Sequence, residues 1–131
     1  RMKTIPFRHK GRTYHLLMNA AALFDIYEKF GSKGFITDHI RGNNRTALEA
    51  ISWMLAKLAE QGELWRRYQG FEGGEMPSEE MFLMTLLPMD MLEARRAIEQ
   101  AVHEGFRMEE GPERSEVDIG LLELQKKTET P

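Results

Sequence analysis

The stretch NRTALEAISWMLAKLAEQGELWRRYQGF, Asn44 to Phe71, decides how the rest of the chain folds. At about 100° per residue, its apolar side chains fall on one face of a helix. These side chains are Ala47, Leu48, Ile51, Met54, Leu55 and Leu58. Asn44 is a favoured N-cap residue, and Gly62 stands where a left-handed glycine commonly ends a helix. We therefore expect a central core helix over residues 44–62, with residues 63–69 as its continuation or as a separate short helix.

The composition is typical of a globular protein. The chain has 131 residues, of which 41% are apolar and 30% charged, which is enough for one domain with a real core. Cysteine is absent, which excludes disulfides and thiolate chemistry and fits a cytosolic protein. No apolar run approaches the roughly 20 residues that span a bilayer, and no secretory signal is visible. We expect a cytoplasmic protein with no membrane association.

Cap and turn residues predict further elements on both sides of the central stretch. Residues 4–18 are expected to form a β-hairpin around a loop that ends at Gly11, and Pro6 suggests an edge strand. A lone hairpin is marginally stable, so it must dock on helices or extend a partner's sheet. Helices are expected at Ala20–Phe30, Phe35–Arg41, Met81–Leu87 and Asp90–Glu104. Asn19 and Ser78 are suitable N-caps, and Gly105 is expected to end the last helix.

The fold predicted for residues 1–106 is mainly α. We expect one compact domain of about four to five helices with an N-terminal β-hairpin at residues 1–18. Residues 107–131 hold seven acidic and four basic residues and include Gly111-Pro112. Such a segment is expected to be a charged, flexible and partly disordered tail, which could contain a short helix around Leu121, Leu122 and Leu124.

No combination of residues indicates catalysis or a metal site. The histidines are His9, His15, His39 and His103, and no two of them stand at i, i+4 spacing. No glycine-containing segment matches a phosphate-binding motif, and Ser52 lies inside a helix, unlike the serine of a nucleophile elbow. We therefore expect a protein that is not an enzyme and that binds no cofactor and no metal.

Two groups of residues are candidates for binding a partner. Trp, Tyr and Arg anchor protein interfaces, and flexible methionines suit surfaces that accept varied apolar partners. The candidate partner-binding residues are Trp53, Trp65, Arg66, Arg67, Tyr68, Phe71, Met81 and Met84. Trp53 falls on the charged face of the central helix. The alternative for both groups is core filling: Trp65 could fold back over Trp53, and Met84 could fill the core together with Met91.

The hairpin supports a second hypothesis, nucleic-acid binding. Residues 1–18 hold five basic and no acidic residues, and Phe7 and Tyr14 could stack on a base. However, the net charge of the chain is −3, and no helix-turn-helix pattern is visible. Nucleic acid is therefore the less favoured partner.

Four segments resemble a known family. They are YHLLMNAAALFDIYEKFG (residues 14–31), AISWMLAKLAEQGELWRRYQG (50–70), LLPMDMLEARRAIEQAVHEGF (86–106) and VDIGLLELQKKT (117–128). In hydrophobic pattern and turn placement they resemble the tail assembly chaperones of long-tailed, siphovirus-like phages and prophages of Gram-positive bacteria. The resemblance covers most of the chain.

This resemblance implies a small, helical, non-enzymatic protein that binds the tape measure protein and recruits tail tube subunits. It implies work in the host bacterial cytoplasm and absence from the mature virion. Copies could pair through the hairpin edge by strand addition. A longer product could arise by frameshifting if Gln125-Lys126-Lys127 is encoded through a slippery run of adenines. A structural tail or head-completion protein that stays in the particle is a further alternative.

Overall fold

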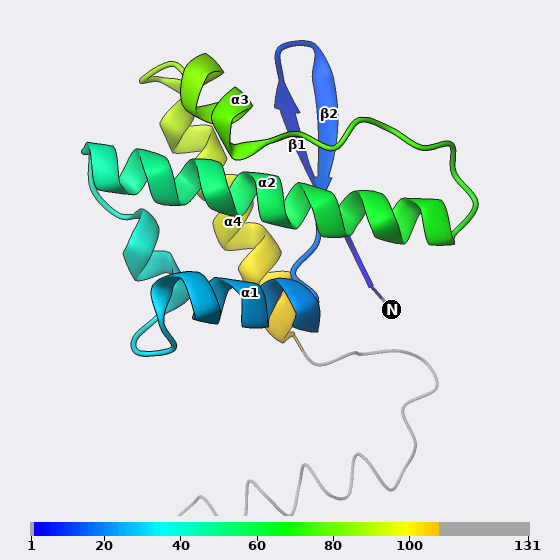
Figure 1. The fold of residues 1–131 in the computed structure, drawn as a ribbon, viewed down its shortest axis with the longest axis horizontal. Helices are drawn as coiled ribbons and strands as arrows, with labels where there is room; N and C mark the ends of the chain where they lie inside the picture. Colours follow the sequence, from blue (N-terminus) through cyan, green and yellow to red (C-terminus); the bar gives the residue numbers. More distant parts are fainter. Residues whose placement is uncertain (1, 108–131) are drawn as a thin grey trace, which may run out of the picture.

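Helix α2 (Arg45–Tyr68) runs through the middle of the structure, a computed structural model that describes residues 2–107. In Figure 1, α1 (Ala20–Phe30) lies below α2, and α3 (Glu79–Thr85) lies above it. The other elements are the strands β1 (Ile5–His9) and β2 (Arg12–Leu16), the 3-10 helix η1 (Ile36–Ile40) and the helix α4 (Asp90–Phe106). Four α-helices and an N-terminal antiparallel hairpin confirm the predicted fold class. The predicted tail helix and the frameshift segment lie outside the described residues.

Cap residues begin the helices where the sequence predicts. The Asn44 side chain accepts a hydrogen bond from the Ala47 N–H at 2.8 Å, and Ser78 caps α3 through the Met81 N–H at 3.1 Å. These side chains occupy amide groups that would otherwise have no partner in the first turn. Helix α3 spans Glu79–Thr85 and not the predicted Met81–Leu87. It ends early because the residue before a proline, here Leu87, is disfavoured in the helical conformation.

Gly62 does not end α2, contrary to the prediction. It is buried within the helix, which continues to Tyr68 as a single element. A Cβ atom at this position would lie 1.6 Å from the carbonyl oxygen of His15. Next to this contact, the Leu17 N–H donates to the Leu58 carbonyl of α2 at 3.0 Å. Gly62 is therefore a position of close approach, where the end of β2 lies directly on the helix.

Gly105 has the same role in α4. The helix continues through it to Phe106, so the prediction that Gly105 ends the helix is also wrong. A Cβ atom on Gly105 would lie 2.5 Å from the carbonyl oxygen of Met18. The short segment between β2 and α1 is thus enclosed by two helices, each of which has a glycine at the contact.

The hairpin covers the core with one face. Its two-residue turn, Lys10-Gly11, has positive φ at both positions (51° and 76°), as the tight turn that matches strand twist requires. The pairing of β1 with β2 places alternate side chains on the inner face. Those buried there are Ile5, Phe7, His9, Tyr14 and Leu16.

Helix α3 docks on the hairpin through Phe82, which is fully buried. Its ring centre lies 5.5 Å from that of Tyr14, 5.7 Å from that of His9 and 6.3 Å from that of Phe7. The His9 ring also shares a hydrogen bond of 2.8 Å with the hydroxyl of Thr85. The hairpin and α3 therefore form one aromatic contact above α2.

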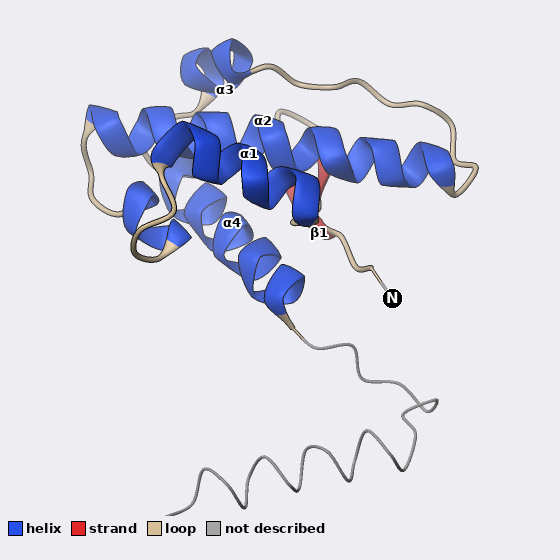
Figure 2. Cartoon of the chain, turned by 60° about the horizontal axis from the view of Figure 1, so that its bottom comes forward, coloured by secondary structure: helices blue, strands red, loops and turns tan. Residues whose placement is uncertain are grey.

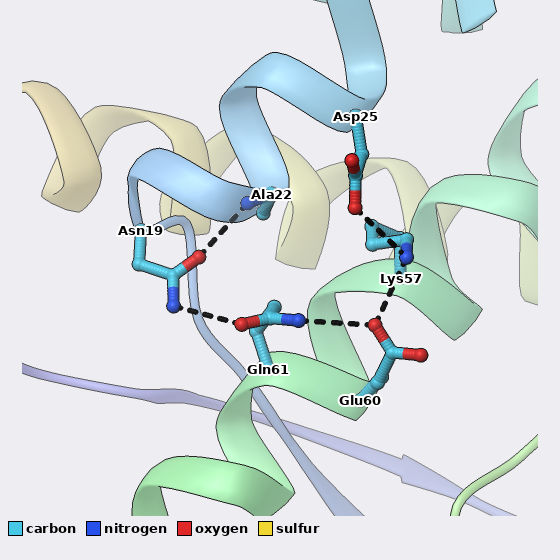
Figure 3. Close-up of polar contacts among 6 residues, drawn as sticks. All are labelled: Asn19, Ala22, Asp25, Lys57, Glu60 and Gln61. Carbon is cyan, nitrogen blue, oxygen red and sulfur yellow. Dashed lines mark hydrogen bonds and ion pairs between the residues drawn. The ribbon is translucent and has the colours of Figure 1, made fainter.

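A chain of polar contacts ties α1 to α2 (Figure 3). Asn19, which caps α1, donates to Gln61 at 3.0 Å, and Gln61 donates to Glu60 at 3.0 Å. The ammonium of Lys57 lies 2.9 Å from Glu60 and 3.0 Å from Asp25. Burial by itself would lower the pKa of Lys57, but the hydrogen bonds to these two carboxylates outweigh it and raise the pKa. Lys57 therefore stays charged and joins the two helices.

We predict that Gly62→Ala destabilises the protein, although alanine normally favours a helix interior over glycine by about 1 kcal/mol. The added methyl group would overlap the backbone of His15. We expect a loss of about 3 kcal/mol in the free energy of unfolding, measured by urea denaturation.

Ser52→Ala is the matched control, since it also places alanine inside α2. The hydroxyl of Ser52 is buried and has no hydrogen-bond partner among residues 2–107. Its removal should leave the free energy of unfolding within about 1 kcal/mol of the natural value or raise it. If Gly62→Ala is as stable as Ser52→Ala, the close contact with β2 does not exist in solution.

We also predict that the protein loses stability as the pH falls below about 6.5, the ordinary pKa of histidine. Burial lowers the pKa of His9, where Asp90 opposes and Lys10 adds to the effect, and burial together with Arg66 lowers the pKa of His15. Below this pH the unfolded chain binds protons that the folded chain does not, so the free energy of unfolding falls.

Urea denaturation at about pH 7.5 and about pH 5.5 measures this loss above the range in which carboxylates titrate. His9→Gln should reduce the difference between the two pH values. A free energy of unfolding that is constant or higher at the lower pH would contradict the prediction.

Candidate functional site

The residues predicted to bind a partner lie at three separate places. Trp53 lies in the middle of α2, on the side of α1. Trp65, Arg66, Arg67, Tyr68 and Phe71 cluster at the carboxyl end of α2. Met81 and Met84 belong to α3. Each place is described in turn, because the side chains differ in what already covers them.

Trp53 is half-buried, and it shares the charged face of α2 with Lys57, as the sequence predicts. The Phe30 ring of α1 meets it edge-on, with ring centres 5.4 Å apart, and the Lys57 ammonium lies 5.9 Å from the centre of its ring. The alternative that Trp65 covers Trp53 is wrong, since Trp65 stacks on Tyr68. Trp53 therefore belongs to the packing of α1 on α2.

The aromatic end of α2, which we define as Trp65, Arg66, Tyr68 and Phe71, does lie at the surface. Trp65 and Tyr68 stack with ring centres 5.7 Å apart, and the Arg66 guanidinium lies 5.1 Å from the centre of the Phe71 ring. Tyr68 is 82% exposed and Phe71 57%. These are rigid aromatic groups beside a cation, the residue types that anchor protein interfaces.

Arg67, and with it Arg66, is held within the chain by Glu63. Glu63 is buried and accepts hydrogen bonds from Arg66 at 3.2 Å, from Arg67 at 3.0 Å and from the Gly74 N–H at 2.7 Å. Burial by itself would raise the pKa of Glu63, but the Gly74 hydrogen bond and the two arginines outweigh it and lower the pKa. Arg67 also donates to the Gly74 carbonyl at 2.9 Å. This network fastens the loop that returns from α2 to α3 across the hairpin (Figures 1 and 2).

A groove of about 820 Å³ lies beside the aromatic end. The N-terminal segment, the start of α1 and the last turns of α2 and α4 line it, and Trp65, Met18 and Phe106 are among its apolar side chains. Glu104 in the groove pairs with Lys3 at 3.8 Å and with Arg107 at 3.2 Å. The carboxylate of Glu104 is thus neutralised by two cations, an arrangement that serves structure better than proton transfer.

A further group of exposed apolar side chains lies at the corner between α3 and α4. Met84 is 80% exposed, Leu87 57%, Met89 84% and Leu92 53%, and we call these four residues the methionine corner. They lie within nine consecutive residues, on α3, its connection to α4 and the first turn of α4.

Only Met84 of this corner was singled out by sequence. The alternative that it fills the core is wrong, whereas Met91 does fill the core, and Met81 is partly buried against it. Leu87 was expected inside the predicted helix Met81–Leu87, and Met89 belongs to the same methionine-rich stretch as Met84, but neither was named as a candidate binding residue. The exposure of Leu92 could have been predicted, because Leu92 does not share the helix face of Met91, Ala94, Ile98 and Ala101, which points to the core.

The aromatic residues of the hairpin and one of its arginines already have partners within the chain. Phe7 and Tyr14 are buried against Phe82, so neither is free to stack on a base. Arg12 forms an ion pair with Glu75, and the Arg8 guanidinium donates to Thr13 at 3.2 Å.

The edges of the hairpin also differ. The edge of β2 lies on α2 at Gly62, which leaves β1 for strand addition. In the register of the hairpin, the backbone groups of Pro6 and Arg8 point away from β2, toward the free edge of β1. Pro6 has no N–H to donate there. Pairing between copies through this edge stays a prediction.

No chemical site emerges from the described part of the chain. Within residues 2–107, no group of His, Asp and Glu side chains is arranged to hold a metal ion, and no helix there is long and apolar enough to cross a membrane. No family model, no curated protein and no solved structure matches the chain.

We predict that Glu63→Gln weakens the loop between α2 and α3. The amide has no charge to pair with the two arginines, and hydrogen bonds to charged groups contribute about 1.5–3 kcal/mol each. We expect a loss of about 2 kcal/mol in the free energy of unfolding. We also expect faster proteolytic cleavage within residues 70–76.

Glu99→Gln is the control, because Glu99 is exposed and its replacement makes the same change in charge. Urea denaturation and limited proteolysis followed by mass spectrometry measure the two effects. If the two variants behave alike, the Glu63 network does not hold the loop.

Proposed function

We propose that this protein is a non-catalytic tail assembly chaperone that binds the tape measure protein and recruits tail tube subunits in the host bacterial cytoplasm. The observation that carries the proposal is the methionine corner, four large apolar side chains that are each more than half exposed within nine residues of chain. Large apolar side chains exposed together in one short stretch of chain are typical of a binding surface.

The chemistry of the corner suits a long helical partner. Burying an apolar side chain of this size stabilises a complex by about 1.5–3 kcal/mol, so a few such contacts support reversible binding. Unbranched methionines adjust to different neighbours, which allows one surface to bind successive segments that differ in sequence. A protein that coats an apolar, helical tape measure in many copies needs such a surface.

The aromatic end supplies a second surface, at the opposite end of α2 from its N-cap. Helix α2 has 24 residues and is about 36 Å long, so two different partners could be bound at the same time. We assign the methionine corner to the tape measure protein and the aromatic end to the second partner, the tail tube subunit.

Two alternatives have less support. Nucleic-acid binding through the hairpin would have to rely on Lys10 and Arg8, because Arg12 is paired with Glu75. Steeply salt-dependent DNA binding would favour that alternative. A structural role in the finished particle is distinguished by mass spectrometry of purified virions, from which a chaperone should be absent. The codons for Gln125-Lys126-Lys127 decide whether a frameshifted longer product is encoded.

The test is co-expression with the tape measure protein of the same gene cluster, followed by size-exclusion chromatography with light scattering. We expect a soluble complex with several copies of this protein for each tape measure chain. Met84→Ser combined with Met89→Ser should reduce the recovered complex at least tenfold. Both side chains are more than three-quarters exposed, so thermal unfolding of the free protein should not change.

Phe24→Ser is the matched control. Phe24 is 62% exposed and lies on α1, on the other side of α2 from α3 (Figure 1). If the tape measure protein stays insoluble in the presence of the natural chain, or if the control loses the complex equally, the proposed function is wrong.

A further inference from the structure

The methionine corner lies in a part of the chain that carries acidic and no basic residues. Residues 72–94 contain six acids and no Lys, Arg or His. The acids are Glu72, Glu75, Glu79, Glu80, Asp90 and Glu93. The exposed apolar side chains are therefore surrounded, along the chain, by carboxylates of one sign.

The placement of these acids brings some of them next to the corner. Glu80 and Met84 stand at i and i+4 on α3, and Met89 and Glu93 have the same spacing at the start of α4, so each pair shares a helix face. Glu80 and Glu93 are exposed, as their neighbours in the corner are. The rim of the apolar surface is thus acidic on both of its helices.

Few cations offset these charges. Glu93 pairs with Arg96 at 3.1 Å, whereas neither Glu79 nor Glu80 pairs with a basic side chain among residues 2–107. Arg95, the other nearby cation, donates to the carbonyl oxygens of Ile40 at 2.8 Å and Gly42 at 2.7 Å. It is used to hold η1 against α4. The charge around the corner is therefore negative.

We propose that the segment bound by the methionine corner is an amphipathic helix with Lys or Arg residues beside its apolar face. This inference rests on the proposed function and names the chemistry of the partner segment. The apolar face of the helix contacts the corner, and its cations face Glu80 and Glu93, while Glu79 adds negative charge at the start of α3. Complementary charge speeds encounter and fixes orientation, and an acidic helix or a nucleic acid is repelled by the same carboxylates.

The experiment uses the full chain and three fluorescent peptides of about 18 residues, a helix of about 27 Å. The first carries leucines on one helical face and lysines on the other, the second has glutamates in place of the lysines, and the third is a scramble of the first. Fluorescence anisotropy should show at least tenfold tighter binding of the first peptide than of the other two.

Raising the salt from about 0.1 M to about 1 M, which shortens the screening length from about 10 Å to about 3 Å, should weaken this binding about tenfold.

Variants locate the binding on the protein. Glu79→Gln combined with Glu80→Gln should weaken binding of the leucine–lysine peptide at least fivefold, and so should Met84→Ser combined with Met89→Ser. The control for the charge change is Glu28→Gln combined with Glu99→Gln, two exposed acids on α1 and α4. This control should bind as the natural chain does.

The inference is overturned if the lysine and glutamate peptides bind alike, if none binds, or if the control weakens binding equally. A chain that still forms the soluble tape measure complex in that case keeps the proposed function and loses only the basic-helix inference. If the protein prefers the lysine peptide but forms no complex with the tape measure protein, the basic-helix inference stands and the proposed function is wrong.

Discussion

The structure depends on the close approach of the end of β2, and of the segment that follows it, to two helices. At one side the backbone of His15 lies on Gly62 of α2, and at the other the backbone of Met18 lies on Gly105 of α4. A Cβ atom at either glycine would overlap its neighbour, at 1.6 Å from the His15 oxygen and 2.5 Å from the Met18 oxygen. The Leu17 amide is then satisfied by the Leu58 carbonyl of α2, so the buried connection leaves no unpaired donor there.

This contact determines where the hairpin lies, and α3 packs against both α2 and the inner face of the hairpin. With β2 fixed on α2, the inner face of the sheet meets Phe82, which is fully enclosed by Phe7, His9 and Tyr14. A helix of seven residues that buries Phe82 inward cannot bury all of its apolar residues. Met84 lies two positions further along the chain, on the outer side, and becomes part of the exposed corner. The candidate binding surface is thus a consequence of how the core is completed.

Much of the fold could be predicted from the sequence because its signals are local. Asn19, Asn44 and Ser78 cap the helices that they were expected to cap, since a cap depends only on the side chain and the next turn. The errors concern Gly62 and Gly105. A glycine that ends a helix and a glycine that admits a neighbouring backbone are identical in sequence, and only the neighbour distinguishes them. The candidate site was predicted less well. Leu87 and Met89 lie in the connection between α3 and α4, where no helical periodicity shows which side chains face the solvent.

The sequence by itself determined which segments become helices and strands, and which face of each carries the apolar residues. Tertiary structure alone decided which apolar residues are covered. Trp53 lies on the charged face of its helix and is half-buried against Phe30, whereas Met84 could have filled the core and is exposed. The physical reason is that periodicity defines a face of one element, while burial depends on a second element that packs against that face. That second element comes from a distant part of the chain, and its position follows from the packing of the whole domain.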